Sequence, residues 1–90
     1  MTNSKAEITK ALLAMIAEIR PKAPALSWQA EKILGAVLDK DMGLDSLDVI
    51  NLYFKIEKTF SFKISAEDIS SHGLSSIGAL TDYISEKTTP

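Results

Sequence analysis

The sequence DMGLDSLDVINLYF, residues 41–54, joins a glycine-containing turn directly to a strongly apolar segment. Asp45 or Ser46 suits the N-cap of a helix, because either side chain can accept a hydrogen bond from an unpaired amide of the first turn. Asp48 adds negative charge where the helix dipole favours it. The stretch therefore predicts a helix from about Ser46 to Phe60 with Ser46 exposed at its N-terminus, a position that tolerates a phosphate ester well.

The predicted helix over residues 46–60 is apolar on more than one face. A surface helix needs a single apolar face, so this helix either lies at the centre of the fold or has a second partner. Periodicity alone leaves both interpretations open. The apolar residues concerned are Leu47, Val49, Ile50, Leu52, Tyr53, Phe54, Ile56 and Phe60.

An earlier helix is predicted from Ser4 and Glu7, which have the spacing of a capping box, to Pro21, which stops it. Residues 22–44 then form a long connection. We expect a short helix or turn over Ser27–Leu34 with Ser27 as its cap, because structureless loops of this length are uncommon. The buried stripe of the first helix comprises Ile8, Leu12, Met15, Ile16 and Ile19, and the side chains expected to hold the connection against the bundle are Trp28, Ile33, Val37 and Leu38.

The last third of the chain carries three further signals. Phe60–Ile64 alternates apolar and polar residues, but no second strand pattern could pair with it, so we expect an extended connector. Ser65 fits a cap for a short helix that Gly73 closes. Ser75 or Ser76 fits a cap for a last helix, and the tail Glu86–Pro90 is expected to be frayed. The inward residues of that last helix are Ile77, Leu80 and Ile84.

Length and composition favour one small domain over residues 1–90 with an apolar core. The chain is 46% hydrophobic and has no cysteine, so neither a disulfide nor a cysteine-bound metal can stabilise the fold. A formal charge of −2 spread over many charged residues argues against a nucleic-acid binder. No apolar run is long enough to span a membrane and the N-terminus lacks a signal peptide's apolar core, so we expect a cytoplasmic protein without membrane insertion.

Hydrolytic catalysis by Ser46 is not supported, because a nucleophilic serine needs a nearby base. The only histidine, His72, stands beside Gly73 in a predicted loop, and no G-x-S-x-G elbow is present. We interpret His72 as a surface or loop-packing residue and expect no enzyme.

A calcium loop starting at Asp39 is not supported either. The calcium-binding template requires an acidic or amide ligand at its fifth position, a glycine at its sixth and a glutamate at its twelfth. Here the fifth position is Gly43 and the twelfth is Ile50, so we expect no specific metal site.

The string Asp41–Asp48 resembles the D-x-G-x-D-S-L signature of acyl carrier proteins and related thiolation domains. Two later segments, Phe60–Ile64 and Ser75–Ile84, are similar to that family's post-helix loop and last helix. The resemblance implies an all-α fold, a small four-helix-type bundle of three longer helices plus a short third helix, with a long loop between helices 1 and 2.

The resemblance also implies a function and its cofactor. In this family the serine of Asp-Ser-Leu, here Ser46, is esterified by 4′-phosphopantetheine, which a separate phosphopantetheinyl transferase moves from coenzyme A. The arm then carries acyl intermediates as thioesters to the enzymes of fatty-acid, polyketide or other specialised acyl-chain biosynthesis. Tethering raises effective concentration, so acyl-transferring, condensing or ligating partners can bind weakly and release quickly.

By the same resemblance, Leu52, Tyr53, Ile56 and Phe60 face inward, and Tyr53, Ile56, Ile64 and Leu80 border an interior that could hold part of an acyl chain. The residues expected to recognise partner enzymes are Asp45, Leu47, Asp48, Ile50, Phe54 and Glu57. Family members present carboxylates along this helix, which steers encounter with basic enzymes. Here Asn51 and Lys58 replace expected glutamates, and Lys55 and Lys63 add positive charge, which favours a dedicated set of partners.

Alternative functions remain at this stage. An aminoacyl or peptidyl carrier of a nonribosomal-type pathway fits the same motif, and an unmodified helical interaction module fits the apolar helix. Met1 and the short polar ends favour a freestanding protein, although a domain excised from a synthase would look similar. We expect a monomer.

Overall fold

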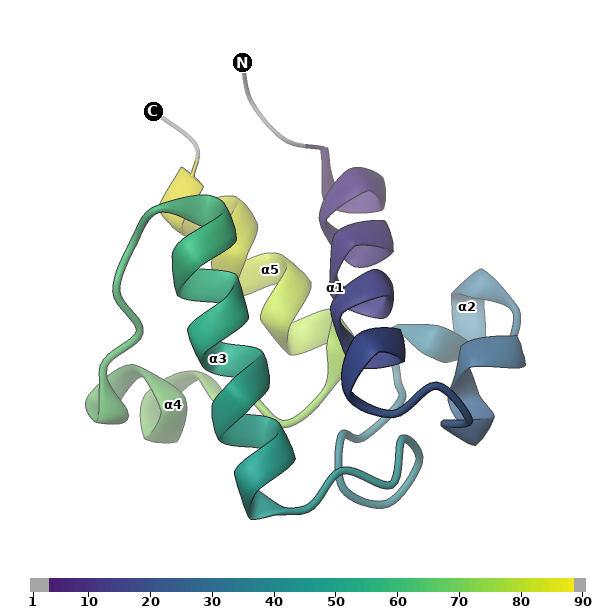
Figure 1. The fold of residues 1–90 in the computed structure, drawn as a ribbon. Helices are drawn as coiled ribbons and strands as arrows, with labels where there is room; N and C mark the ends of the chain where they lie inside the picture. Colours follow the sequence, from purple (N-terminus) through teal and green to yellow (C-terminus); the bar gives the residue numbers. More distant parts are fainter. Residues whose placement is uncertain (1–3, 89–90) are drawn as a thin grey trace.

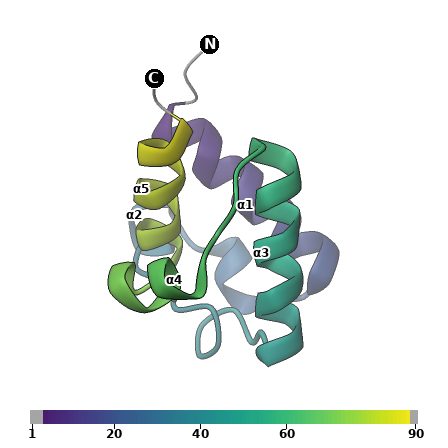
Figure 2. The same ribbon diagram turned by 90° about the vertical axis from the view of Figure 1, so that its left-hand side faces the viewer.

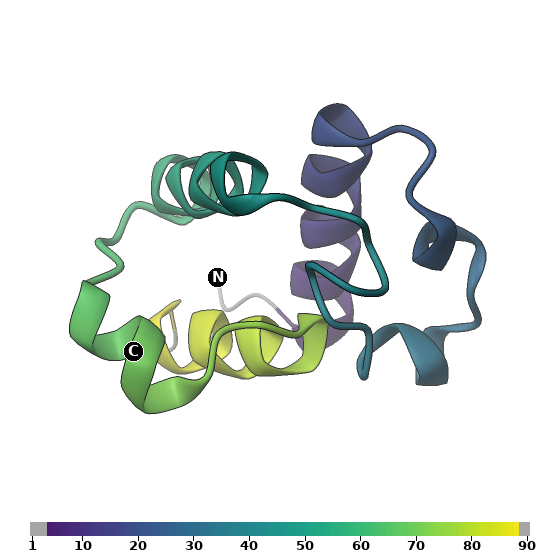
Figure 3. The same ribbon diagram turned by 90° about the horizontal axis from the view of Figure 1, so that it is seen from below.

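Three long helices form a bundle in the computed structural model, which describes residues 4–88 (Figure 1). They are α1 (Lys5–Ile19), α3 (Ser46–Phe60) and α5 (Ile77–Thr88). A shorter helix, α4 (Ala66–His72), lies at one end of the molecule, and the helical turns η1 (Pro24–Ser27) and α2 (Ala30–Ile33) lie at the other (Figures 1 and 3). Residues 4–88 contain no strand, only an isolated bridge between Val37 and Ser76. The predicted all-α bundle with a long first connection is confirmed.

Helix α1 begins and ends where its sequence predicts. The Ser4 hydroxyl accepts a hydrogen bond from the Glu7 amide at 3.2 Å, which is one half of the predicted capping box. The helix ends at Ile19, and Pro21 follows two residues later. One face of α1 packs against both α5 and α3. The fully buried side chains at this centre are Ile8, Leu12 and Ile16 of α1, Leu52 and Ile56 of α3, and Ile77, Leu80 and Ile84 of α5.

The connection between α1 and α3 differs from the prediction in two respects. Ser27 ends the turn η1 instead of capping a helix, and α2 begins after Gln29, whose side chain makes no cap hydrogen bond. Trp28 lies between the two short turns with 38% of its surface exposed, so the prediction that it holds the connection against the bundle is wrong. The predicted burial of Ile33 and Leu38 is confirmed. The other apolar residues that hold the connection are Ala23, Ala36, Met42 and Leu44.

The predicted extended connector after α3 is confirmed, and it runs back alongside α3 to α4 (Figure 2). The Ser65 hydroxyl caps α4 by accepting from the Asp68 amide at 3.0 Å. Gly73 closes α4 with a φ of 57°, a backbone conformation that glycine adopts without steric cost. Of the two candidate caps for α5, Ser76 performs the role and accepts from the Ala79 amide at 3.2 Å. His72 is the last residue of α4 and not part of a loop, and its side chain lies outside the described part of the structure.

The predicted fraying from Glu86 onward is wrong as far as Thr88, because α5 continues to that residue. The Lys87 ammonium lies 3.8 Å from the Asp68 carboxylate and 5.6 Å from the centre of the Tyr83 ring. The Thr88 hydroxyl donates to the Ile84 carbonyl at 2.8 Å. These contacts continue the helix by one turn, and residues 89–90 lie outside the described part.

Candidate functional site at the start of helix α3

The turn that precedes α3 is fixed by the side chain of Asp41. Its carboxylate accepts a hydrogen bond from the Val37 amide at 2.7 Å, while the Asp41 amide donates to the Val37 carbonyl at 2.9 Å. Gly43 has a φ of 73°, which a residue with a side chain adopts only with strain. On either side of this glycine Met42 and Leu44 are buried, and the chain therefore reaches the start of α3 in a defined orientation.

Asp45 is the N-cap of α3, which decides between the two candidates in the sequence. Its carboxylate accepts from the Asp48 amide at 2.8 Å, and the Asp48 carboxylate accepts from the Asp45 amide at 3.3 Å. This reciprocal capping box satisfies two amides that the helix leaves unpaired. Ser46 is therefore the first helical residue, exposed to solvent, and its hydroxyl has no hydrogen-bond partner among residues 4–88.

Arg20, at the end of α1, links that helix to the start of α3. Its Nε donates to the Asp48 carboxylate at 2.9 Å, and a terminal guanidinium nitrogen lies 3.9 Å from the Asp45 carboxylate. Partial burial tends to raise the pKa of Asp48, but the hydrogen bonds from Arg20 and from the Asp45 amide outweigh it, so the pKa lies below its ordinary value. The sequence analysis missed this residue, because no local pattern connects positions 28 residues apart.

The two apolar faces of α3 divide as expected. Leu52 and Ile56 are fully buried, and Tyr53 and Phe60 are half-buried. On the outer side Leu47 is 71% exposed, Ile50 46% and Phe54 62%. The exposure that a recognition surface needs is therefore present close to Ser46.

A hollow of about 360 Å³ opens beside Ser46 between α3, α4 and the preceding turn. Its apolar lining consists of Leu38, Leu44, Val49, Ile50, Tyr53 and Ile69. The Tyr53 hydroxyl donates to the Leu74 carbonyl at 2.7 Å, and burial raises its pKa. Of the residues predicted to border such an interior, only Tyr53 lies in this lining. Ile56 and Leu80 are instead fully buried in the core.

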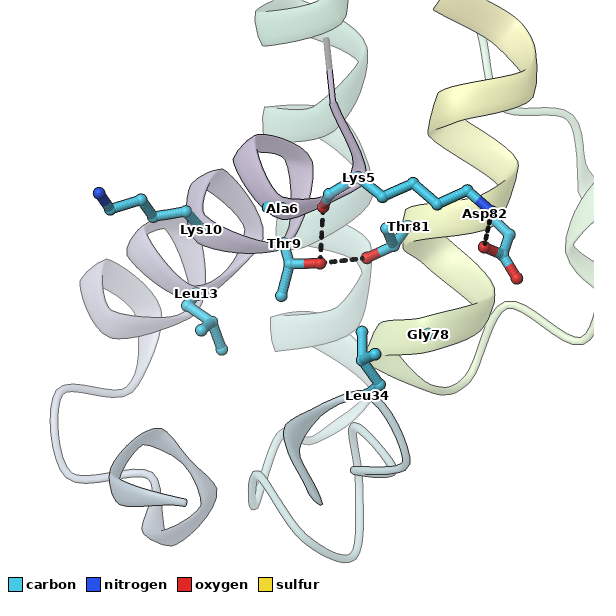
Figure 4. A pocket seen from close by; sticks show the side chains of 9 residues that line it. All are labelled: Lys5, Ala6, Thr9, Lys10, Leu13, Leu34, Gly78, Thr81 and Asp82. Carbon is cyan, nitrogen blue, oxygen red and sulfur yellow. Dashed lines mark hydrogen bonds and ion pairs between the residues drawn. The ribbon is translucent and has the colours of Figure 1, made fainter. Parts of the chain in front are cut away.

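A larger hollow of about 660 Å³ lies elsewhere, between α1, α2 and α5 (Figure 4). Lys5 and Asp82 form an ion pair of 3.0 Å at its edge, and the hydroxyls of Thr9 and Thr81 lie 3.0 Å apart in its wall. None of its lining residues belongs to the capped start of α3. The candidate site is therefore assigned by the chemistry at Ser46 and not by the size of a cavity.

The structure gives each predicted recognition carboxylate an internal contact. Asp45 and Asp48 form the capping box and face Arg20, and Glu57 accepts a hydrogen bond from the Ile64 amide at 2.7 Å. Glu57 thus fixes the connector after α3. Within residues 4–88 no group of three or more histidine, cysteine, aspartate or glutamate side chains could hold a metal ion. No helix in the same range is long and apolar enough to cross a membrane.

The geometry at Ser46 suits a group attached through a phosphodiester. Its hydroxyl is exposed, it stands at the positive end of a long helix, and the Arg20 guanidinium offsets the two neighbouring carboxylates. The apolar hollow beside it offers a surface for a hydrocarbon portion of an attached group. The residues present therefore fit 4′-phosphopantetheine.

Comparisons with known proteins agree with this geometry. Residues 10–84 match a protein-family model described as the phosphopantetheine attachment site. The chain is also similar to an acyl carrier protein of Amoebophilus asiaticus (strain 5a2), with 31% identity over 81 residues, which cover 90% of this chain and 92% of that relative. The chain therefore belongs to the phosphopantetheine-binding family of acyl carrier proteins, which are carriers with a 4′-phosphopantetheine cofactor and not enzymes.

Proposed function

We propose that Ser46 bears the 4′-phosphopantetheine and that the chain delivers acyl intermediates to successive enzymes of fatty-acid, polyketide or other specialised acyl-chain biosynthesis. The observation that carries this proposal is the unpartnered, exposed hydroxyl of Ser46 at the capped start of α3. It lies inside residues 10–84, which match the attachment-site family.

The residues around Ser46 would hold the attachment position open. Asp45 and Asp48 cap the helix, so their carboxylates are turned toward backbone amides and leave the serine hydroxyl free. Arg20 reduces the repulsion that these carboxylates would exert on a phosphodiester. When bound, the arm supplies a thiol that holds acyl groups as thioesters. The apolar hollow beside Ser46 is where this chain would shield part of a short acyl group from water.

Recognition by partner enzymes would use the outer face of α3. Leu47, Ile50 and Phe54 provide apolar contact close to Ser46, while Asp45, Asp48 and Glu57 contribute charge. A surface of three exposed apolar side chains suits brief encounters with a phosphopantetheinyl transferase and with acyl-transferring, condensing or ligating enzymes, because large stable interfaces bury far more area. A single domain over residues 1–90 that acts as a monomer in the cytoplasm completes the proposal.

The test is intact-protein mass spectrometry after incubation with coenzyme A and a broad-specificity phosphopantetheinyl transferase. The parent chain should gain the mass of one phosphopantetheine, and Ser46→Ala should gain none. Ser71→Ala, which removes an exposed serine hydroxyl from α4, is the matched control and should be modified like the parent. Modification of Ser46→Ala would place the arm on another residue and contradict the proposal.

Loading of the modified protein would then separate acyl carriage from the alternative of an aminoacyl or peptidyl carrier. Acyl-transferring and amino-acid-activating enzymes are offered to the same preparation, and the mass of the thioester product identifies the cargo class. Failure of a folded parent to accept phosphopantetheine while a control carrier is modified would favour an unmodified helical interaction module.

A further inference from the structure

The carboxylates on the outer face of α3 overstate the negative charge that a partner would meet there. Asp45, Asp48 and Glu57 are each engaged by an arginine or a backbone amide within the chain. Engaged carboxylates attract an approaching partner less than free ones, because the charge of Arg20 offsets Asp45 and Asp48 and the dipole of the Ile64 amide weakens the field of Glu57. The charges on α3 that remain available to a partner therefore have to be sought among its lysines.

Two lysines at and just beyond the C-terminal end of α3 are such free charges. Lys55 forms an ion pair with Glu18 at 2.9 Å, but Lys58 and Lys63 are exposed and have no ion-pair partner among residues 4–88. Lys58 follows Phe54 by four residues and so lies on the same side of the helix. Lys58 in the last turn also suits the helix dipole, whereas Lys63 lies beyond the helix and gains nothing from it.

Phe54 stands between two hollows that Lys58 also lines. One, of about 400 Å³, includes Phe62 and Lys63, and the other, of about 480 Å³, includes Ile19 and Asn51. Glu57 also lines the first hollow and Asp48 the second, but the Ile64 amide and Arg20 engage these carboxylates. An exposed aromatic side chain with a recess on each side and unpaired cations at its edge has the features of an interface anchor, since aromatic residues often provide such anchors. Twelve residues separate Ser46 from Lys58, about 18 Å along the helix at 1.5 Å per residue. The surface is therefore distinct from the attachment position.

We propose that the surface formed by Phe54 and Lys58 of α3 together with Lys63 of the following connector docks a partner enzyme whose surface has an apolar socket for Phe54 bordered by carboxylates. This inference rests on the proposed function, because the partner would be an enzyme that uses the group on Ser46. At this end of α3 the encounter would be driven by positive charge on the carrier, whereas Asp45 and Asp48 contribute negative charge at the other end, beside Ser46.

Two other occupants fit the surface less well. An anionic membrane would be attracted by only two free lysines beside one aromatic side chain, and stable attachment generally needs a larger cluster of basic residues. A second copy of the chain would meet this surface through a twofold axis in an isologous contact. That arrangement would bring the same lysines toward one another, and like charges at close range are unfavourable.

Binding of two amphipathic helical peptides to the full chain tests the proposal. Both peptides share one apolar stripe with a central leucine anchor; one has glutamates beside the stripe and the other has lysines. Affinity is measured by fluorescence titration at low and moderate salt, and the contact surface by amide chemical-shift changes. The variant Lys58→Glu/Lys63→Glu reverses the proposed charge. Its matched control, Lys10→Glu/Lys32→Glu, makes the same net change at exposed lysines of α1 and α2.

The expected result is that the parent binds the glutamate peptide about tenfold more tightly than the lysine peptide at low salt, with shifts centred on Phe54. The preference should reverse in Lys58→Glu/Lys63→Glu, persist in Lys10→Glu/Lys32→Glu, and disappear in Phe54→Ala. Equal binding of the two peptides, preference for the lysine peptide, or shifts centred elsewhere would overturn the proposal. So would tighter binding to anionic vesicles than to the glutamate peptide, or self-association in sedimentation that depends on Lys58.

Transfer of phosphopantetheine is recorded in parallel for all these variants. Lys58 and Lys63 lie at and beyond the far end of α3 from Ser46, and Lys10 and Lys32 lie in α1 and α2, so both double variants should still be modified. If the parent gains no phosphopantetheine but still prefers the glutamate peptide, only the proposed function is contradicted. If the parent is modified normally but shows no preference for the glutamate peptide, only this inference is contradicted.

Discussion

Arg20 connects the end of α1 to the start of α3, where we propose that the phosphopantetheine is attached. Its hydrogen bond of 2.9 Å to Asp48 involves a carboxylate that is only 18% exposed, so the contact is partly screened from water. The pKa of Asp48 is lowered in the folded chain. A lowered pKa means that ionised Asp48 stabilises the fold at neutral pH, and that this contribution is lost as the pH falls through the pKa of the folded state.

Replacing Arg20 with glutamine should therefore raise the pKa of Asp48, because burial still opposes the charged form after the guanidinium is removed. The free energy of unfolding should drop near neutral pH, and its difference from the parent should shrink as the pH falls through the lowered pKa of Asp48 in the folded parent, because the carboxyl group is then protonated in both proteins. Carbon NMR of the Asp48 carboxyl group and urea unfolding at several pH values measure both quantities. Lys22→Gln, also an exposed cation, is the control and should leave the Asp48 signal unchanged. An unshifted Asp48 pKa in Arg20→Gln would show that Arg20 is not its cause.

The residues of the site differ in how far the sequence could reveal them. A cap at Asp45 or Ser46 follows from the local sequence, and the structure selects Asp45 and leaves Ser46 exposed. Periodicity did not decide which apolar face of α3 points outward. The family resemblance implied that Leu47 and Phe54 do, and both are exposed. Asp41 is the first residue of the D-x-G-x-D-S-L string. Its hydrogen bond to the Val37 amide could not be predicted from that string, because the bond depends on the shape of the turn. Arg20 and the amide of Ile64, which holds Glu57, meet their partners only through tertiary packing, which no local pattern encodes.

At the scale of elements, α4 and α5 are joined through Tyr83. Its ring is 2% exposed and meets the Phe62 ring edge-on at 5.8 Å, and its hydroxyl donates to the Asp68 carboxylate at 2.6 Å. Burial raises the pKa of Tyr83, and the bond to Asp68 raises it further. A raised pKa means that this contribution to stability is complete below the ordinary tyrosine pKa, near 10, and declines as the pH rises above it.

Tyr83→Phe keeps the ring but removes the hydrogen bond, so unfolding at neutral pH should cost about 1.5 kcal/mol less than in the parent. The gap between the two proteins should narrow from about pH 10 upward, because the unfolded parent then releases a proton that folded Tyr83 retains. Guanidinium unfolding monitored by circular dichroism at pH values between 7 and about 11 provides the measurement. Tyr53→Phe removes a bond to a neutral carbonyl and should cost about 1 kcal/mol or less. Equal effects of the two variants would argue against a special contribution from Asp68.

Helix ends show what local sequence determines about an element. Ser4, Ser65 and Ser76 cap their helices because a side-chain oxygen reaches an amide two or three residues ahead, and that geometry is local. The short turns η1 and α2 were misplaced because a helix of one turn has little intrinsic stability and takes its position from tertiary contacts. The last turn of α5 was missed for a similar reason, since Lys87 contacts Asp68 and Tyr83 across the fold.

At the scale of the whole molecule, α1 packs against both α3 and α5. The core face of α1 therefore supports the helix that begins at Ser46. Helical spacing predicted that face, and Ile8, Leu12 and Ile16 are indeed fully buried. The exposed position of Trp28 could not be predicted in the same way. A large aromatic residue usually packs inside, but its burial here depends on where the two turns of the connection lie relative to α1.

Two leucine-to-alanine changes distinguish the contribution of the α1 core face to stability from the contribution of the exposed face of α3 to recognition. Leu12 is fully buried and Leu47 is 71% exposed, and both lie in long helices where leucine and alanine have similar propensity. Leu12→Ala should lose about 2–5 kcal/mol of unfolding free energy, a large share of the stability of a small domain. Leu47→Ala should change it by about 0.5 kcal/mol or less. Urea unfolding measures both values.

The same pair should respond differently to the phosphopantetheinyl transferase. Leu12→Ala should be modified slowly. A high concentration of a stabilising osmolyte should restore much of the rate, because the osmolyte favours the compact state without binding at Ser46. Leu47→Ala should remain folded and be modified slowly in osmolyte as well, since it has lost an apolar contact beside Ser46 that refolding cannot replace. If Leu47→Ala reacts like the parent, the exposed face of α3 is not where the transferase docks, and the support of α1 beneath Ser46 would be the main requirement for its modification.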